Sequence, residues 1–182
     1  MTLARVSTAL SAAPDPWAGS AARQAARLAV APMIDWTDRL RTTVDMDAIM
    51  ATTLEALGTF MGASRVTYSV GDAAGRDFAV SGEWRNGVGS IAHTHFSLDW
   101  VPDRQLAEWL GGEPLRFDNV AADPRVAATI RRIYDGAQIS AFLTIPLIEE
   151  GRALCALSVQ QSEPRHWRED EVALVRDVAE RA

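Results

Sequence analysis

The sequence predicts an α+β domain built around one mainly antiparallel β-sheet. Two β-hairpins are expected, over residues 65–84 and 139–160, because in each of them two strand-forming segments are joined by a short turn. Helical patterns stand before, between and after these hairpins. Hairpins interrupted by helices favour an antiparallel sheet with helices on its faces over a doubly wound parallel sheet.

The domain is expected to follow a helical extension. Residues 1–18 are rich in Ala and Ser and contain two prolines, so we expect a flexible leader. Residues 19–37 predict an N-terminal helical extension, whose alanine-rich helix ends at Pro32. Residues 38–182 form the predicted domain. Its last helix shows no Gly or Pro stop signal, so we expect an output helix that continues into another domain; a natural frayed end is the alternative.

The elements of the domain follow from its periodicity. Apolar residues recur at helical spacing over residues 45–62, which predicts the best-defined core helix. Asp123-Pro124 predicts a helix start, with Asp as the N-cap and Pro at the first helical position, and this helix ends at Gly136. The other expected elements are strands at 65–70, 77–84, 91–98, 115–120, 139–148 and 153–160, and helices at 102–110 and 169–182.

Composition excludes several functions. The chain has 18 arginines and no lysine against 24 acidic residues, for a net charge of −6, so lysine Schiff-base and P-loop chemistry are impossible. Dispersed arginines in an acidic chain match nucleic acid poorly, and we expect no nucleic-acid partner. No apolar run reaches about 18 residues, so we expect no membrane contact by this segment. The single Cys155, expected in the core, indicates a reducing compartment, the cytoplasm.

Catalytic residues are not predicted. The sequence contains no Gly-x-Ser-x-Gly, no zinc-hydrolase pair and no Gly-rich phosphate loop. One cysteine is also too few for a thiol–disulfide cycle. We therefore expect a protein that is not an enzyme.

A known family resembles much of the chain. Its second half carries the most specific motifs: Ile139-Ser-Ala-Phe-Leu-Thr-Ile-Pro-Leu-Ile148, Gly151-Arg152, Ala153-Leu-Cys-Ala-Leu-Ser-Val-Gln-Gln161, Pro164-Arg-His-Trp167 and Glu171-Val-Ala-Leu-Val175. Together they resemble the C-terminal half of a GAF domain, of the kind found in bacterial sensor histidine kinases and phytochrome-like signalling proteins. Upstream, residues 45–66, 112–120 and 122–125 are similar to the first helix and middle segment of that family.

The resemblance implies a fold and a role. The fold is a central sheet with helices on its faces and with the N- and C-terminal helices packed together. The role is that of a sensory domain, which binds a small ligand between the sheet and the segments that cross one face. The terminal helices would relay the signal to an output domain such as a histidine kinase. Arg165 beside Trp167 is expected to fix the approach of the last helix to the sheet.

Ligand-binding residues are predicted around that face. Aromatic residues cluster in the variable region, and polar residues follow the middle strand or lie on the helix that would cover the pocket. Ordinary core packing and a solvated helix face are the alternatives. The predicted ligand-binding residues are Trp84, Phe96, Asp118, Asn119, Arg131, Tyr134 and Gln160.

The cofactor stays open. Bilin-binding relatives attach the chromophore through a cysteine, often in the helix that spans residues 124–135 here, and this helix has neither Cys nor His. Cyclic-nucleotide-binding relatives carry a signature that includes a lysine, which this chain lacks. A minor alternative is a metal or haem sensor, because His93 and His95 on one strand would share a face, with Asp99 or Asp118 as oxygen ligands. A polar strand edge is the competing interpretation.

A homodimer through the terminal helices is also expected. Trp36, Leu40 and Val44 form an apolar stripe, and together with the helix at 20–31 and the last helix they carry more apolar surface than one layer on the sheet needs. A second copy would bury this surface in a parallel helical bundle. The alternative function is therefore a ligand-free dimerisation scaffold within a signalling protein.

Overall fold

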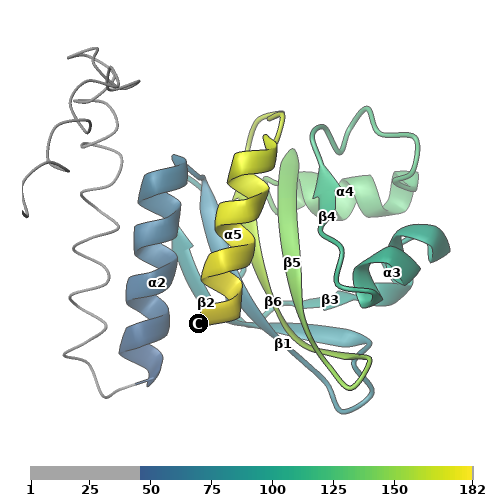
Figure 1. Ribbon diagram of the computed structural model, residues 1–182. Coiled ribbons are helices and arrows are strands. Elements are labelled where there is room, and N and C mark those ends of the chain that lie inside the picture. Colours follow the sequence, from purple (N-terminus) through teal and green to yellow (C-terminus); the bar gives the residue numbers. More distant parts are fainter. Residues whose placement is uncertain (1–45, 182) are drawn as a thin grey trace, which may run out of the picture.

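Six strands form one sheet in the order β3-β2-β1-β6-β5-β4 (Figure 1). The computed structural model describes residues 46–181, so the predicted leader, the helical extension and the Trp36–Val44 stripe lie outside the described residues. All the strand pairs are antiparallel, which confirms the predicted α+β class. The elements are α2 (Met46–Met61), β1 (Arg65–Gly71), β2 (Asp77–Arg85), β3 (His95–Ser97), the 3₁₀ helix η1 (Leu98–Trp100), α3 (Asp103–Leu110), β4 (Leu115–Phe117), α4 (Ala128–Gly136), β5 (Ala141–Glu149), β6 (Arg152–Gln161) and α5 (Glu169–Arg181).

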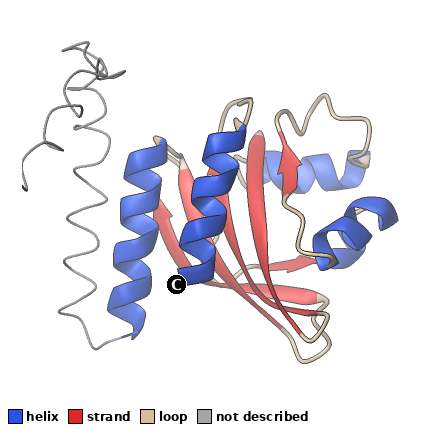
Figure 2. Ribbon diagram, viewed as in Figure 1, coloured by secondary structure: helices blue, strands red, loops and turns tan. Residues whose placement is uncertain are grey.

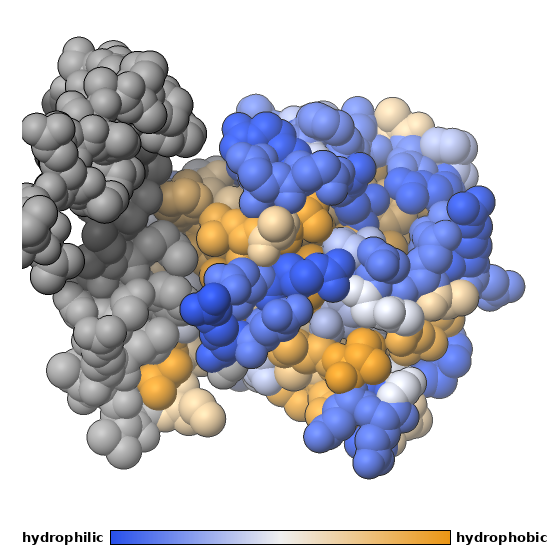
Figure 3. Space-filling view, in the orientation of Figure 1, coloured by the Kyte–Doolittle hydropathy of each residue, from blue (hydrophilic) through white to orange (hydrophobic). Residues whose placement is uncertain are grey.

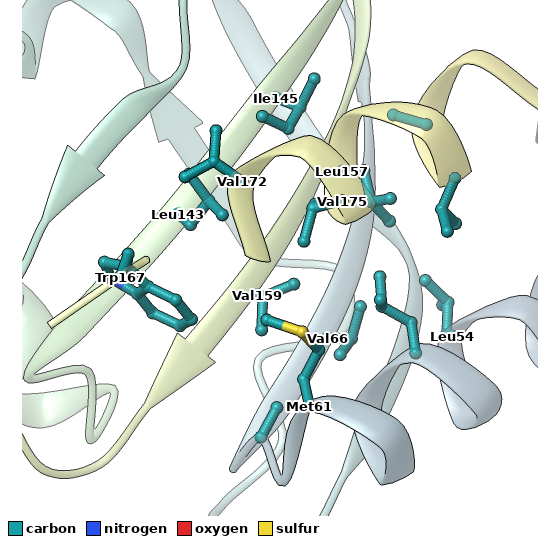
Figure 4. Packing of buried hydrophobic residues seen from close by; sticks show 14 of the residues in the cluster. Leu54, Met61, Val66, Leu143, Ile145, Leu157, Val159, Trp167, Val172 and Val175 are labelled. Carbon is teal, nitrogen blue, oxygen red and sulfur yellow. The ribbon is translucent and has the colours of Figure 1, made fainter. Parts of the chain in front are cut away.

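Helices α2 and α5 lie side by side on one face of the sheet (Figures 1 and 2). Leu54 of α2 and Val175 of α5 pack with Leu157 of the sheet, and each is at most 1% exposed. Figure 4 shows these side chains converging with their neighbours between the helices and the strands. Full burial of a side chain of this size stabilises the fold by about 1.5–3 kcal/mol. The helices at the two ends of the domain are therefore packed together, as expected.

The start of α5 is held by Arg165 and Trp167. The Arg165 guanidinium lies 4.8 Å from the centroid of the Trp167 ring. It donates hydrogen bonds to the Met61 carbonyl at 2.8 Å and to Glu171 at 2.6 Å. The buried Trp167 donates its indole N–H to the Phe117 carbonyl at 3.2 Å. Arg165 thus joins the end of α2 to the first turn of α5, which fixes the approach of that helix.

The other face of the sheet carries η1, α3 and α4. A second apolar cluster lies there and is separate from the one beneath α2 and α5. Phe78 and Phe142 of the sheet belong to it, as do Trp109 of α3 and Tyr134 of α4. The rings of Phe78 and Trp109 meet edge to face, with centroids 5.5 Å apart. The sheet therefore has two apolar faces, and each is covered by its own helices.

A β-bulge in β2 changes which face its side chains occupy. Tyr68 pairs with Gly82 and Ser69 pairs with Val80, so Ser81 has no partner opposite it in β1. One extra residue reverses the alternation of side chains along a strand. Phe78, before the bulge, consequently lies in the α3–α4 cluster, whereas Trp84, after it, packs against the α2–α5 core.

The strand expected over residues 91–98 was too long. The regular strand β3 covers only His95–Ser97, although the Val80 backbone of β2 still donates to the Thr94 carbonyl and accepts from the His93 N–H, both at 3.0 Å. His93 has a left-handed φ of 64°, and the Thr94 N–H donates to the Ile91 carbonyl at 3.1 Å. These residues form a turn, so the chain becomes extended only at His95.

The helix predicted to start at Asp123-Pro124 was also placed too early. The Asp123 carboxylate accepts hydrogen bonds from the Arg125 backbone N–H and from its Nε, both at 2.9 Å. It therefore closes a local turn and does not cap a helix. Val126 is then buried in the core, and α4 begins at Ala128.

Some apolar side chains are exposed on the α2–α5 face. Figure 3 shows hydrophobic patches there, between hydrophilic ones. Met50, Phe60 and Leu174 are only partly buried there, and Met46 is 69% exposed. None of the helices that the structure describes is long and apolar enough to span a lipid bilayer.

The close contact between α2 and Trp84 predicts that adding one methyl group at Gly58 lowers the stability of the fold. A Cβ added at Gly58 would lie 2.1 Å from Cε3 of Trp84, so the helix or the indole must move. We expect Gly58→Ala to cost about 1–3 kcal/mol of unfolding free energy in a urea titration. Gly136→Ala is the matched control, because no described atom lies within 4 Å of that Cβ, and it should cause no loss. Equal unfolding midpoints for the two variants would contradict this packing.

Candidate functional site

A small cavity lies between the sheet and the segments that cover its α3–α4 face. Its volume is about 80 Å³. Its floor is polar and comes from the central strands, with Thr67 and Ser69 on β1, Thr144 on β5, and Ser158 and Gln160 on β6. The hydroxyls of Thr144 and Ser158 are 2.6 Å apart and share a hydrogen bond. Since side chains alternate along a strand, the neighbouring residues Leu143 and Leu157 face α5.

Aromatic and aliphatic side chains form the other walls. Phe96 comes from β3, Trp100 from η1, Trp109 from α3 and Tyr134 from α4. A polar floor beneath aromatic walls is the usual arrangement of a small-molecule site, in which a few polar groups orient the ligand.

Two polar groups from the walls lie deep in the protein. Trp109 is 3% exposed, and its indole N–H has no hydrogen-bond partner among the residues that the structure describes. Burial raises the pKa of the Tyr134 phenol to about 12. The phenol therefore stays neutral at physiological pH.

Gln160 at the edge of the cavity is held by a buried arginine. Arg65 is 1% exposed, and its Nη1 donates to Gln160 Oε1 at 2.9 Å. Its Nη2 donates to the carbonyls of Gly89 at 2.6 Å and Ala137 at 3.1 Å. The guanidinium thus ties β1 to β6, to the loop after β2 and to the end of α4.

Glu83 neutralises this arginine. Its Oε1 lies 3.2 Å from Arg65 Nε, and the two side chains are 7% and 1% exposed. The same carboxylate accepts hydrogen bonds from Ser90 Oγ at 2.5 Å and from the Ile91 N–H at 2.8 Å. Burial lowers the pKa of Arg65, and the charge of Glu83 opposes that shift.

Three of the predicted ligand-binding residues line the cavity together: Phe96, Tyr134 and Gln160. Trp84 does not, because the Ser81 bulge turns it to the opposite face, where its ring packs over Gly58 of α2. Trp84 is therefore not among the residues that line this cavity.

Asp118 and Asn119 lie elsewhere, on an open groove of about 1060 Å³ between α3, β4 and α5. Asp118 pairs with His166 Nδ1 at 2.5 Å and accepts from the Trp167 N–H at 3.3 Å. Asn119 accepts from the Ala122 N–H at 3.1 Å and closes a turn. The groove is larger than the cavity, but charged side chains that pair with one another dominate it. We therefore take the small cavity on the α3–α4 face as the candidate site.

Arg131 lies on the outer side of α4. It lines a separate shallow pocket with Arg132 and Asp135, and its Nη2 donates to the Asp123 carbonyl at 2.7 Å. This bond anchors the turn that precedes α4, and Arg131 is not among the residues that line the cavity.

The metal alternative does not fit the geometry. His93 lies in the left-handed turn and His95 on β3, so the two rings do not share one strand. Asp99 pairs with Arg76, and Asp118 with His166. Within residues 46–181, no group of three or more His, Cys, Asp or Glu residues is arranged to hold a metal ion.

Sequence reasoning predicted Gln160 but missed the rest of the polar floor and the Arg65–Glu83 pair. Thr67, Ser69, Ser158 and Gln160 alternate with apolar residues on β1 and β6, which is usually typical of a solvated face. One sequence signal could have revealed this floor. Helical segments precede and follow each hairpin, so helices were available to cover both faces of the central strands.

Residues 45–182 match the family model described as the GAF domain. The far-red absorbing dark state of JSC1_58120g3 with bound biliverdin IXa is similar, with a TM-score of 0.70 and 17% identity over 82% of this chain and 94% of that chain. The chromophore-binding domain of bacteriophytochrome RpBphP3 from R. palustris gives a TM-score of 0.67 and 16% identity over 82% of this chain, which spans 58% of that chain.

The blue-light absorbing form of the Thermosynechococcus elongatus PixJ GAF domain is a further similar structure. Its TM-score is 0.63, at 17% identity over 75% of this chain and 85% of that chain. At such identities the likeness shows a common fold. No curated protein matches the chain.

The buried ion pair between Arg65 and Glu83 predicts that removing one partner destabilises the fold more than the removal of both partners would suggest. Arg65→Met leaves the Glu83 charge buried without its partner, so we expect a loss of about 3–5 kcal/mol in urea unfolding. Arg65→Met combined with Glu83→Met should cost clearly less than the sum of the two single changes. Arg104→Met removes an exposed pair with Glu108 and should cost about 0–1 kcal/mol. A loss for Arg65→Met no larger than for this control would refute the role of the pair.

The two tyrosines of the chain predict an alkaline transition. Burial raises the pKa of Tyr134 to about 12, and burial together with a hydrogen bond to Cys155 raises the pKa of Tyr68 to about 12. The phenols ionise near pH 10 in the unfolded chain, so their stabilising contribution is complete below about pH 10 and is lost towards pH 12.

At about pH 11 we expect little tyrosinate absorbance from the folded protein and a large increase when urea is added. Tyr134→Phe should remove about half of that increase, since it leaves one of the two tyrosines. Full tyrosinate absorbance from protein that remains folded at pH 11 would show that the phenols are not shielded.

Proposed function

The chain belongs to the GAF domain family, and on this premise we propose that it is a sensory domain that binds a small ligand in the cavity between the sheet and α3–α4. A sensory role without catalysis is typical of this family. One observation carries the proposal for this chain: the cavity joins a polar floor from the central strands to aromatic walls from the crossing segments.

The route of the signal is part of the proposal. Ser158 and Thr144 border the cavity, whereas the adjacent Leu157 and Leu143 belong to the core beneath α5. An occupant that shifts β5 or β6 thus changes the packing surface of α5 from the other side of the same strands. A ligand biases the position of α5 only by the difference between its affinities for the two arrangements.

We infer the wider organisation from the same premise. The domain, residues 38–182, follows a helical extension and sends its output through α5 to a domain such as a histidine kinase. The partly buried residues Met50, Phe60 and Leu174 on the α2–α5 face favour a homodimer that is completed by the terminal helices. The one cysteine suits the cytoplasm, where thiols stay reduced.

Filling the cavity tests the ligand site. Ala156 is 4% exposed and lines the cavity, so Ala156→Leu would occupy its space. We expect a ligand found by thermal-shift screening of biliverdin, cyclic nucleotides and neutral aromatic molecules to lose its stabilising effect in this variant. Ala51→Leu, on the exposed surface of α2, is the matched control and should retain the effect. Equal stabilisation of both variants would place the ligand elsewhere.

The same screen separates the sensor from the scaffold. A scaffold would gain no stability from any compound, and native mass spectrometry would find dimers without a retained small molecule. A ligand-dependent shift that Ala156→Leu abolishes would exclude the scaffold as the whole function.

A further inference from the structure

Buried polar side chains gather at the small cavity. Three of the five polar or charged residues that are buried within residues 46–181 line it: Thr67, Ser69 and Gln160, which are 1%, 8% and 6% exposed. The strand register adds two more hydroxyls beside them, because Ser158 of β6 pairs with Thr67 of β1 and with Thr144 of β5. Three adjacent strands therefore present a row of hydroxyls to one small space.

These groups keep hydrogen-bonding capacity that the protein does not use. The Ser69 hydroxyl has no partner among the residues that the structure describes. The Thr67 hydroxyl accepts only a long hydrogen bond, at 3.5 Å from Gln160 Nε2. Thr144 and Ser158 share one hydrogen bond, so the second of their two hydroxyl hydrogens is left for another acceptor. Buried polar groups in folded proteins are normally paired, either with the protein or with ordered water.

The volume of the cavity suits a few water molecules. It measures about 80 Å³, and one molecule of liquid water takes about 30 Å³, so about two or three water molecules fill it. Each bound water also needs about two to four polar partners, and the hydroxyls and the amide of the floor supply them. An apolar occupant would leave these buried groups unpaired, which costs free energy.

We propose that the cavity binds a cluster of about two or three ordered water molecules, which form hydrogen bonds with Ser69, Thr67 and the Thr144–Ser158 pair. The cluster joins β1 to β5 and β6 through hydrogen bonds that these side chains do not make directly. This inference goes beyond the proposed function, because it concerns the solvent that a ligand displaces on entry. A ligand that does not replace the hydrogen bonds of well-ordered water loses affinity.

A high-resolution crystal structure of the full chain tests the proposal. We expect about two or three ordered water molecules in the cavity, with one of them bonded to Ser69 Oγ. Thr67→Val combined with Ser69→Ala removes two hydroxyls and nearly preserves the shape of both side chains, so at least one of these waters should be lost. Ser81→Ala, which removes a hydroxyl from the exposed bulge of β2, is the matched control and should keep the whole cluster.

Two crystallographic results would overturn the proposal. The first is a cavity without ordered water in the wild-type chain. The second is a complete cluster in the double variant, which would show that the two hydroxyls do not hold it. The double variant is first checked by urea unfolding. If it does not fold, the wild-type structure and the xenon measurement below decide the matter.

Xenon gives an independent measurement in solution, because it enters apolar cavities that stay dry. We expect xenon NMR of the full chain to show no saturable binding in the cavity. Xenon binding that Ala156→Leu abolishes and Ala51→Leu retains would show that the cavity is dry, and it would overturn the proposal. That result would leave the proposed sensory function standing, since the compound screen described above tests it separately.

Discussion

The charge of Arg65 is the constraint on which much of this structure depends. A buried guanidinium is costly unless an opposite charge and hydrogen-bond acceptors compensate it. Gln160, Gly89 and Ala137 accept hydrogen bonds from its two Nη atoms, and the Glu83 carboxylate supplies the opposite charge 3.2 Å from Nε. These four partners come from separate parts of the chain. The pair therefore determines where the loop after β2 and the end of α4 lie relative to the central strands. The floor of the cavity is consequently positioned by electrostatics as much as by apolar packing.

The single sheet separates two environments of different character. On the α2–α5 side, aliphatic residues such as Leu54, Val175 and Leu157 make a dry core. On the other side, hydroxyls and an amide lie among aromatic rings and leave a small space. The same strands supply both surfaces because successive side chains point to opposite faces. A conventional core thus supports the fold, while the second layer is free to be less densely filled.

Periodicity was sufficient for the class of the fold and for most of its elements. The helix at 45–62, both hairpins and the last helix are where the pattern placed them, because long amphipathic segments carry a strong signal. The site was less accessible. Phe96, Tyr134 and Gln160 meet in the cavity, but the Ser81 bulge reverses the face of Trp84. A bulge adds one residue without a composition signal, and the pairing of Arg65 with Glu83 joins two strands at positions that a local pattern does not relate.

The distribution of roles between the two layers bears on how such a domain diversifies. Three aromatic walls of the cavity, Trp100, Trp109 and Tyr134, come from the short segments η1, α3 and α4, which rest on the sheet but take no part in the α2–α5 core. Substitutions in these segments would alter which molecule is accommodated while α2 and α5 keep their contacts. Under the proposed sensory function, the walls that select a ligand would thus be distinct from the residues that pack α2 and α5. A lineage with this architecture is able to change what it detects without rebuilding how it reports.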